Sequence, residues 1–324
     1  MNRKRRLIIE GNEVSELKTY SLGGYEQKVL IDGKSRSNPV LIFLHGGPGS
    51  PIPFCEGCRG LFPEYTDKMV IVYWDQLGCG INNCKIDDSF TADSFADMTV
   101  DLIKLVKGEF PDSPIYLLGM SWGSVLAAKA AERVPELIDG VIVYGQILSN
   151  LTFNDEVYGA LEKSKMPSAA RKKLSEIKAL REKTVNDTFT VMKYIRKYTD
   201  GYICKSGKSP SVLPILLGIL SSPDYRFRDF RAMVINGYTK DTAIMKSLHL
   251  LDLRDTFTRI EVPYLIMQGS TDIVTSTTMI REYISGLGRD NLSVMIIPDS
   301  GHIPNETAID KIFEECSRLA EEKV

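Results

Sequence analysis

The pentapeptide G-M-S-W-G at residues 119–123 constrains the fold of this chain more than any other feature. It follows the apolar stretch 115–118 and precedes the helix-forming stretch 125–132, so its context predicts a strand, a sharp turn and a helix. A G-x-S-x-G sequence in this setting is typical of a nucleophile elbow, where both glycines let the strand and the helix approach closely. Ser121 is therefore predicted to stand at the edge of a sheet as a nucleophile.

Two later strand ends supply an acid and a base. An apolar run at 263–267 ends in a turn with Asp272 just past it, and another run at 293–297 is followed by His302 in a loop. Serine, aspartate and histidine in this chain order are expected of an α/β-hydrolase. We predict that Ser121, Asp272 and His302 form a catalytic triad, with Asp299 as the rival acid.

The chain contains only three histidines, which limits the choice of base. His45 is interpreted as a structural residue that hydrogen-bonds its own loop. His249 lies in a stretch that the pattern predicts to be helical, where a core or surface role is expected. His302 remains as the base.

A buried strand at 39–44 runs into the glycine-rich loop H-G-G-P-G at 45–49. In α/β-hydrolases one oxyanion donor is the N–H of the residue after the nucleophile, and the other comes from the loop after the third strand. Trp122 and Gly47 are the expected donors, because Pro48 has no N–H. The chemistry that follows is acyl transfer through an acyl-enzyme, which needs no metal and no organic cofactor.

The composition agrees with an enzyme and argues against a nucleic-acid-binding or membrane-spanning protein. At 324 residues, with 43% hydrophobic and 25% charged residues, the chain can bury a large core. The net charge of −2 argues against a nucleic-acid partner. No apolar run approaches transmembrane length, so we expect no membrane partner and a cytoplasmic location. The expected ligand is a small molecule or a short peptide, and the oligomeric state is left open.

Four of the six cysteines follow the glycine-rich loop and the next strand: Cys55, Cys58, Cys79 and Cys84. A zinc or redox cluster is one interpretation of this group. Reduced thiols are favoured, because the chain shows no signal peptide and no second closely spaced cysteine pair.

The order of predicted elements indicates an insertion. A hairpin is predicted at 14–31, and strands near 39, 69, 114 and 140 alternate with helices, the clearest at 91–110. This alternation predicts a mostly parallel sheet with helices on both faces. The predicted domains are the first part of the α/β-hydrolase core at 1–146, an all-helical cap at 147–251, and the second part of the core at 252–324.

Three motifs, H-G-G-P-G at 45–49, W-D-Q-L-G-C-G at 74–80 and S-W-G-S at 121–124, occur together with the helical cap and Gly301-His302. With these features the chain resembles the proline iminopeptidase family of α/β-hydrolases. The resemblance covers essentially the whole core and, more loosely, the cap. It implies a serine peptidase that releases an N-terminal proline, and the family also includes hydrolases of other small amides, esters or lactones.

The resemblance also suggests substrate contacts. Family members hold the free α-amine with cap carboxylates, one of them in an E-N-H-Y-like stretch, and the best match here is I-N-G-Y at 235–238. Gly46, Ile235 and Tyr238 are therefore the expected substrate-binding residues. Ile235 replaces the acid, and Leu77 replaces the usual arginine of the D-Q-R-G element. A proline-releasing aminopeptidase and a hydrolase of uncharged small amides, esters or lactones both stay open, with a non-catalytic ligand receptor as a remote alternative.

Overall fold

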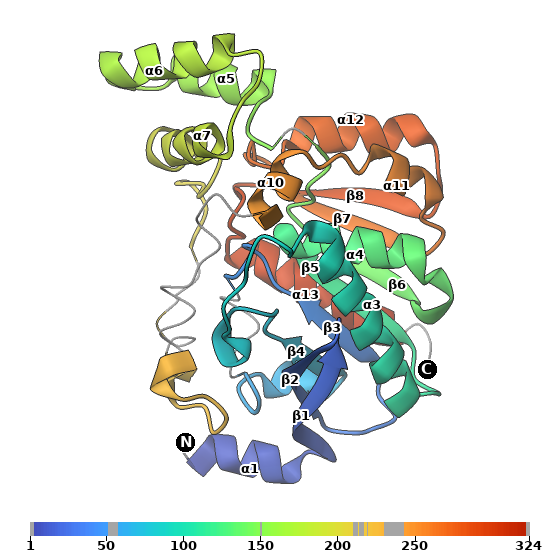
Figure 1. Cartoon of the computed structure of the whole chain (residues 1–324). Coiled ribbons are helices and arrows are strands. Elements are labelled where there is room, and N and C mark those ends of the chain that lie inside the picture. The colour runs from blue at the N-terminus through green and yellow to red at the C-terminus, as the bar shows by residue number, and fades with distance from the viewer. Residues whose placement is uncertain are drawn as a thin grey trace.

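One eight-stranded sheet forms the centre of the molecule (Figure 1). The computed structural model describes residues 3–50, 58–149, 151–209, 213, 217–218, 220–229 and 243–321. The strand order is β1-β2-β4-β3-β5-β6-β7-β8. The β1–β2 and β2–β4 pairs are antiparallel and all other neighbours are parallel. This is the mostly parallel α/β architecture that the alternating pattern predicts.

The strands are short and, in the middle of the sheet, buried along their whole length. They are β1 (Val14–Leu22), β2 (Tyr25–Gly33), β3 (Val40–Leu44), β4 (Val70–Trp74), β5 (Ile115–Met120), β6 (Gly140–Tyr144), β7 (Tyr264–Gly269) and β8 (Leu292–Ile297). Every residue of β3, β4 and β6 is buried, as expected for strands covered on both faces. The predicted hairpin is confirmed as β1 and β2, which turn at Gly23 and Gly24.

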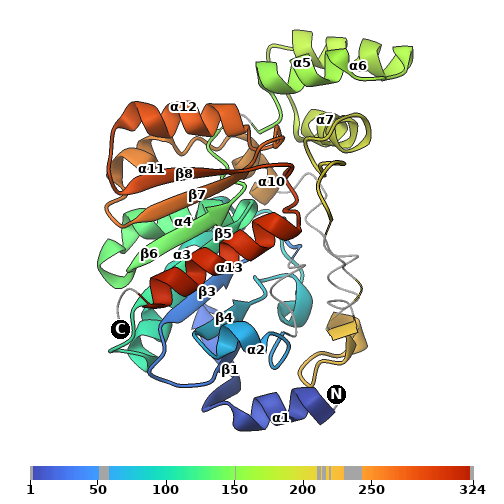
Figure 2. The ribbon, with the colours of Figure 1, turned by 180° about the vertical axis from the view of Figure 1, so that it is seen from behind.

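Helices cover both faces of the sheet. The helices in the described part of the chain are α1 (Arg3–Gly11), α2 (Pro63–Thr66), α3 (Ala92–Glu109), α4 (Trp122–Arg133), α5 (Asp155–Lys163), α6 (Ser168–Ala179), α7 (Val185–Tyr198), α10 (Ala243–His249), α11 (Arg254–Arg259), α12 (Thr277–Leu287) and α13 (Glu306–Glu321), of which α5, α6 and α7 lie away from the sheet. The apolar residues of α3, α4, α11 and α12 pack on one face. Those of α2 and α13 pack on the other, which Figure 2 shows from behind.

The helix predicted at 91–110 is confirmed as α3. Thr91 accepts a hydrogen bond from the Ser94 N–H, and the Ser94 hydroxyl reaches back to the Thr91 N–H, which forms a capping box. Phe95, Met98 and other apolar residues at helical spacing are buried against the sheet. The capping box explains why the helix begins after Thr91, and the apolar stripe explains which side of the helix packs against the sheet.

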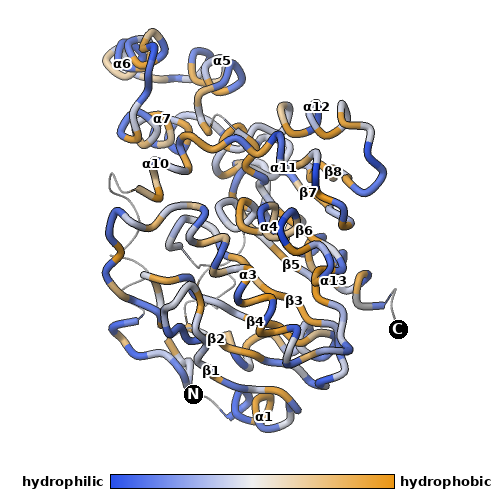
Figure 3. Tube along the Cα trace, turned by 45° about the vertical axis from the view of Figure 1, so that its right-hand side comes forward, coloured by the Kyte–Doolittle hydropathy of each residue, from blue (hydrophilic) through white to orange (hydrophobic). Residues whose placement is uncertain are grey.

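The chain between β6 and α11 is an insertion above the sheet. The helices α5, α6, α7 and α10 lie in its described part, and its two ends meet in an antiparallel bridge between Ser149 and Asp252. Helices α5, α6 and α7 share a small apolar core that also takes in Ile273 and Val274. In Figure 3 the outer helix α6 is mostly hydrophilic, whereas the central strands are mostly hydrophobic. The boundaries at 147 and 251 stay a prediction.

None of the helices in the described part of the chain combines the length and the apolar character needed to cross a bilayer. The cytoplasmic location remains a prediction.

Candidate active site

Ser121 lies in a strained turn between β5 and α4. Its backbone has φ 49° and ψ −112°, a conformation that residues with a side chain seldom adopt. A Cβ atom on Gly119 would lie 2.7 Å from the Gly123 carbonyl oxygen, and one on Gly123 would lie 1.9 Å from the Leu44 carbonyl oxygen. The two glycines of the motif therefore permit the close packing that holds this elbow.

The structure brings Ser121, His302 and Asp272 together from three distant parts of the chain. The Ser121 Oγ atom is 2.9 Å from His302 Nε2, and His302 Nδ1 is 3.0 Å from Asp272 Oδ2. Asp272 is fully buried and His302 is 8% exposed. Because a carboxylate only accepts hydrogen bonds, the Nδ1–H donates to Asp272, and Nε2 is left to accept from the serine hydroxyl.

Hydrogen bonds hold the Asp272 carboxylate in place. Its Oδ1 accepts from the backbone N–H groups of Val274 and Thr275, at 2.8 and 3.1 Å, and its Oδ2 accepts from the Thr275 hydroxyl at 2.6 Å. The rival acid, Asp299, accepts instead from the Ser206 hydroxyl at 2.6 Å. The carboxylate that contacts His302 is thus that of Asp272.

The glycine-rich loop lies against the serine. A Cβ on Gly46 would lie 3.1 Å from the Met120 carbonyl oxygen and 3.5 Å from the Ser121 Cβ. Gly47 has φ 123°, a conformation that favours glycine. Trp122 begins α4, where the first N–H groups have no acceptor within the helix. Both predicted oxyanion donors therefore belong to segments that border Ser121, and their roles remain predictions.

A buried network behind this loop was missed by the sequence analysis, and Gln76 is its centre. The Gln76 N–H donates to His45 Nε2 at 3.0 Å, and its side-chain Oε1 accepts from the Trp122 indole at 2.8 Å. His45 Nδ1 then donates to the Gly46 carbonyl at 2.8 Å. Burial lowers the pKa of His45 to about 4, so this imidazole stays neutral and holds the loop, as predicted. The feature that could have pointed to Gln76 in the sequence is its position just after β4, at the end of a buried strand.

Asp75, next to Gln76, is buried in an unusual setting. Its Oδ2 accepts from the Tyr225 hydroxyl and from the Ile81 N–H, whereas its Oδ1 has no hydrogen-bond partner within the described residues. Burial raises the pKa of this carboxyl to about 7, against the two hydrogen bonds and with help from nearby Asp229. Asp75 is thus poised to change its charge near neutral pH.

We expect Asp75→Asn to flatten the pH dependence of stability. A carboxyl whose pKa rises from 3.8 to about 7 on folding contributes stability that is fully present below about pH 4 and is lost as the pH rises through 7. One pKa unit corresponds to roughly 1.4 kcal/mol. The free energy of unfolding of the wild-type protein should therefore fall by about 2 to 3 kcal/mol between pH 5 and pH 8, and that of the variant should not show this fall. Asparagine still accepts from Tyr225 and Ile81. Urea unfolding at both pH values measures the difference, and identical pH dependence would contradict it.

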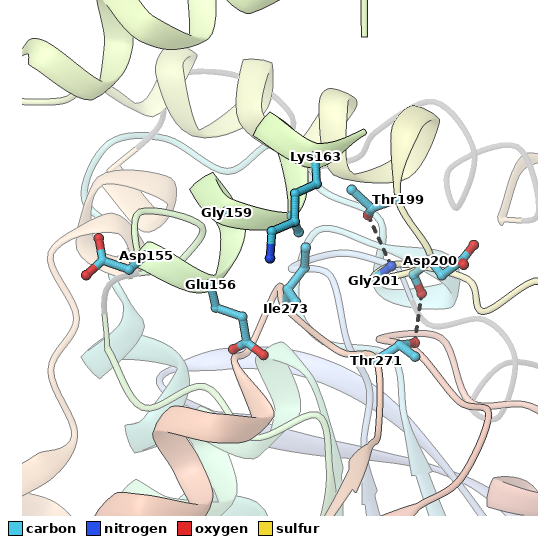
Figure 4. Close-up of a pocket in the computed structure, with 10 residues that line it drawn as sticks. Asp155, Glu156, Gly159, Lys163, Thr199, Asp200, Gly201, Thr271 and Ile273 are labelled. Atoms are coloured by element: carbon cyan, nitrogen blue, oxygen red, sulfur yellow. Dashed lines mark hydrogen bonds between the residues drawn. The ribbon is translucent and has the colours of Figure 1, made fainter. Parts of the chain in front are cut away.

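A cavity of about 530 Å³ opens between α5 and two loops beside the Asp272 region (Figure 4). Its lining includes Lys163 and Glu156 of α5, Gly201, and Thr271 and Ile273 on either side of Asp272. Both Glu156 oxygens already accept hydrogen bonds, from the Ser276 and Thr278 hydroxyls. Ser121 and His302 are not in this lining.

Two of the predicted substrate contacts, Ile235 and Tyr238, lie outside the described residues, as does Cys55. Gly46 borders Ser121, as noted above. Among the described residues, no group of three or more histidine, cysteine or acidic side chains could hold a metal ion. No disulfide joins two cysteines within that part of the chain.

Comparison with known proteins agrees with this geometry. Residues 39–166 match the family described as alpha/beta hydrolase fold. The chain is 23% identical over 307 residues to a probable aminopeptidase, YbaC, of Bacillus subtilis, covering 92% of this chain and 94% of that protein. It is 26% identical over 309 residues to a proline iminopeptidase of Lactobacillus acidophilus, covering 92% and 89%.

A crystal structure of a proline iminopeptidase from Mycobacterium smegmatis has a TM-score of 0.63 and 16% identity, covering 95% of this chain and 98% of that one. Together with the elbow, the sheet and the inserted helices, these findings identify the chain as a hydrolase of the α/β-hydrolase fold. The resemblance to proline iminopeptidases that its motifs predict is confirmed.

Proposed function

We propose that this hydrolase cleaves small acyl substrates through Ser121, His302 and Asp272, by way of a covalent acyl-enzyme. The observation that carries the proposal is the pair of hydrogen bonds from Ser121 Oγ to His302 Nε2 and from His302 Nδ1 to Asp272 Oδ2. A serine hydroxyl is a weak nucleophile until a neighbouring base takes its proton. The buried aspartate fixes the useful tautomer of the imidazole and stabilises the imidazolium that forms.

The reaction then has two halves. Ser121 Oγ attacks the acyl carbonyl while His302 Nε2 takes the hydroxyl proton. The N–H groups of Trp122 and Gly47 donate hydrogen bonds to the negatively charged carbonyl oxygen that forms. His302 gives that proton to the leaving amine or alcohol as the bond breaks. In the second half His302 takes a proton from water, which attacks the acyl-enzyme carbonyl. His302 then returns that proton to Ser121 Oγ as the ester bond breaks, which releases the acid and regenerates the serine hydroxyl.

We propose an aminopeptidase that releases an N-terminal proline as the particular activity. The support is that two relatives matching almost the whole chain are a probable aminopeptidase and a proline iminopeptidase. The inserted helices sit above the sheet on the side of the elbow, where a cap can enclose a short peptide end (Figure 1).

Hydrolysis of uncharged small amides, esters or lactones is the second candidate, and the state of two cap acids favours it. The Glu156 carboxylate accepts hydrogen bonds from two hydroxyls, and Asp224 forms a partly buried ion pair with Arg59. Ile235 stands where the family has an acid. A free ammonium in a closed pocket needs a carboxylate partner to offset its desolvation.

The two candidates differ in their response to blocking the substrate's amine. If the chain is an aminopeptidase, kcat/KM for proline p-nitroanilide should exceed that for N-acetylproline p-nitroanilide by at least about 100-fold, which corresponds to roughly 3 kcal/mol of transition-state binding. Steady-state assays of both anilides and of p-nitrophenyl acetate give the comparison. Equal or faster cleavage of the acetylated anilide would reject the aminopeptidase and favour the second candidate.

A further inference from the structure

The segment 199–208, which leaves α7, lies along the loop that carries His302, and we call it the clamp. The His302 N–H donates to the Gly201 carbonyl at 3.0 Å, and the Ile303 N–H donates to the Tyr202 carbonyl at 2.8 Å. Farther along, the Glu306 N–H donates to the Lys208 carbonyl at 3.0 Å. In Figure 2 this segment descends from α7 beside the loop between β8 and α13.

The clamp and the histidine loop pack without space for a further methyl group. A Cβ on Gly301 would lie 2.9 Å from the Tyr202 carbonyl oxygen and 3.0 Å from that of Asp200. A Cβ on Gly207 would lie 2.0 Å from the Asp299 carbonyl oxygen. Backbone atoms cannot move aside as the end of a side chain can, so the distance between the two segments is fixed.

The clamp also contacts the loop that carries Asp272. The Thr271 hydroxyl donates to the Asp200 carbonyl at 2.8 Å, as the dashed line in Figure 4 shows. A Cβ on Gly201 would lie 2.4 Å from Ile273 Cγ1 and 2.9 Å from its Cδ1. The clamp thus contacts both the loop that carries Asp272 and the loop that carries His302.

The side chain of Tyr202 faces the imidazole. Its ring centroid is 5.8 Å from that of His302, with the ring planes inclined by 35°. From α7, the Arg196 guanidinium lies 4.2 Å from the Tyr202 ring centroid and donates to the Tyr202 hydroxyl at 2.9 Å. The position of α7 is therefore linked to the ring that borders His302.

We infer that Gly201 and Tyr202 are positioning residues for His302, and that through them the inserted helices set the orientation of the base. This inference rests on the proposed function, in which His302 takes the serine proton. A catalytic group must be held within about 0.5 Å of its productive position. A shift of about 1 Å can reduce the rate on the order of 100-fold even when binding is unchanged.

The test is Gly201→Ala in the full chain. The φ of Gly201 lies outside the left-handed region, so alanine fits the backbone. The new Cβ collides with Ile273 and makes only a tight contact, at 3.3 Å, with Thr199 Oγ1. We expect kcat for p-nitrophenyl acetate to fall at least tenfold while KM changes less than threefold. Reaction of Ser121 with a fluorophosphonate should slow in parallel, and thermal unfolding should stay cooperative.

Two comparisons separate positioning from a general disturbance. The Ile273→Ala change removes both colliding atoms, so Gly201→Ala/Ile273→Ala should recover most of the kcat that Gly201→Ala loses. Gly286→Ala in α12 is the matched control, since its new Cβ meets nothing within 4 Å, and its kcat should equal that of the wild type. Unchanged kcat in folded Gly201→Ala, or no recovery in the double variant, would overturn the inference.

A second substitution covers the case in which Gly201→Ala fails to fold. Gly207→Ala places its Cβ against the Asp299 carbonyl and should separate the same segments, again lowering kcat more than it raises KM. Full kcat in folded Gly207→Ala would also contradict the inference that the clamp positions His302. Failure of the proposed function gives a different result, because Ser121→Ala would then keep its activity.

Discussion

Ser121→Ala should reduce turnover by at least about 10⁴-fold while leaving the protein folded. The substitution removes the hydroxyl that lies 2.9 Å from His302 Nε2 and that the proposed mechanism uses as the nucleophile. What activity remains comes from the oxyanion donors and from substrate binding. The measurement is kcat on the best substrate of the anilide and ester comparison, with thermal unfolding as the test of folding.

The controls for Ser121→Ala follow from the way a triad works. His302→Ala should cost a similar factor, and the double variant should be no worse than either single one, because the side chains act as a unit. Ser37→Ala, at an exposed serine, is the matched control and should keep wild-type turnover. Near-normal turnover by Ser121→Ala would contradict the mechanism.

Gly123→Ala should be the most destabilising methyl addition in the core, with a loss of about 3 kcal/mol or more of the free energy of unfolding. Its Cβ would lie 1.9 Å from the Leu44 carbonyl oxygen, 2.6 Å from the Leu44 carbonyl carbon and 2.9 Å from the His45 carbonyl oxygen. All three are backbone atoms at the end of β3, so α4 must move away from the sheet. The movement would also displace the glycine-rich loop from Ser121.

Urea unfolding measures this effect, with Gly108→Ala in α3 as the control. A Cβ on Gly108 meets nothing within 4 Å, and alanine in a helix is favoured over glycine by up to about 1 kcal/mol, so this variant should be as stable as the wild type or more so. Wild-type stability and activity in Gly123→Ala would show that the elbow is not packed as described.

Much of the fold could be predicted because short apolar strands and amphipathic helices leave local patterns. The hairpin β1–β2 and the capped helix α3 are local features, and both are confirmed. The antiparallel pairing of β2 with β4 joins segments about 40 residues apart and has no local signal. Similarly, the packing of α1 through Arg5 on the carbonyls of Arg59 and Gly218 could not be foreseen from its basic sequence.

The candidate site divides in the same way. Ser121, Asp272 and His302 each follow a strand whose carboxyl end lies on one edge of the sheet, so chain order alone predicts that they meet. Asp272 was preferred to Asp299 from the sequence, because Asp299 lies only three residues before His302 on the same loop. The hydrogen bond between His302 Nδ1 and Asp272 Oδ2 agrees with that choice. The contact between the clamp and the histidine loop could not be predicted from the sequence, because it is made by backbone hydrogen bonds, which residues of any type can form.

Peptide mapping by mass spectrometry after reaction with a fluorophosphonate identifies the nucleophile directly. We expect a single phosphonyl adduct on Ser121 at close to one per chain, with none on Ser121→Ala and much slower formation on His302→Ala. An active, folded protein whose only adduct lies on another residue, or that carries no adduct at all, would contradict the claim that Ser121 is the nucleophile.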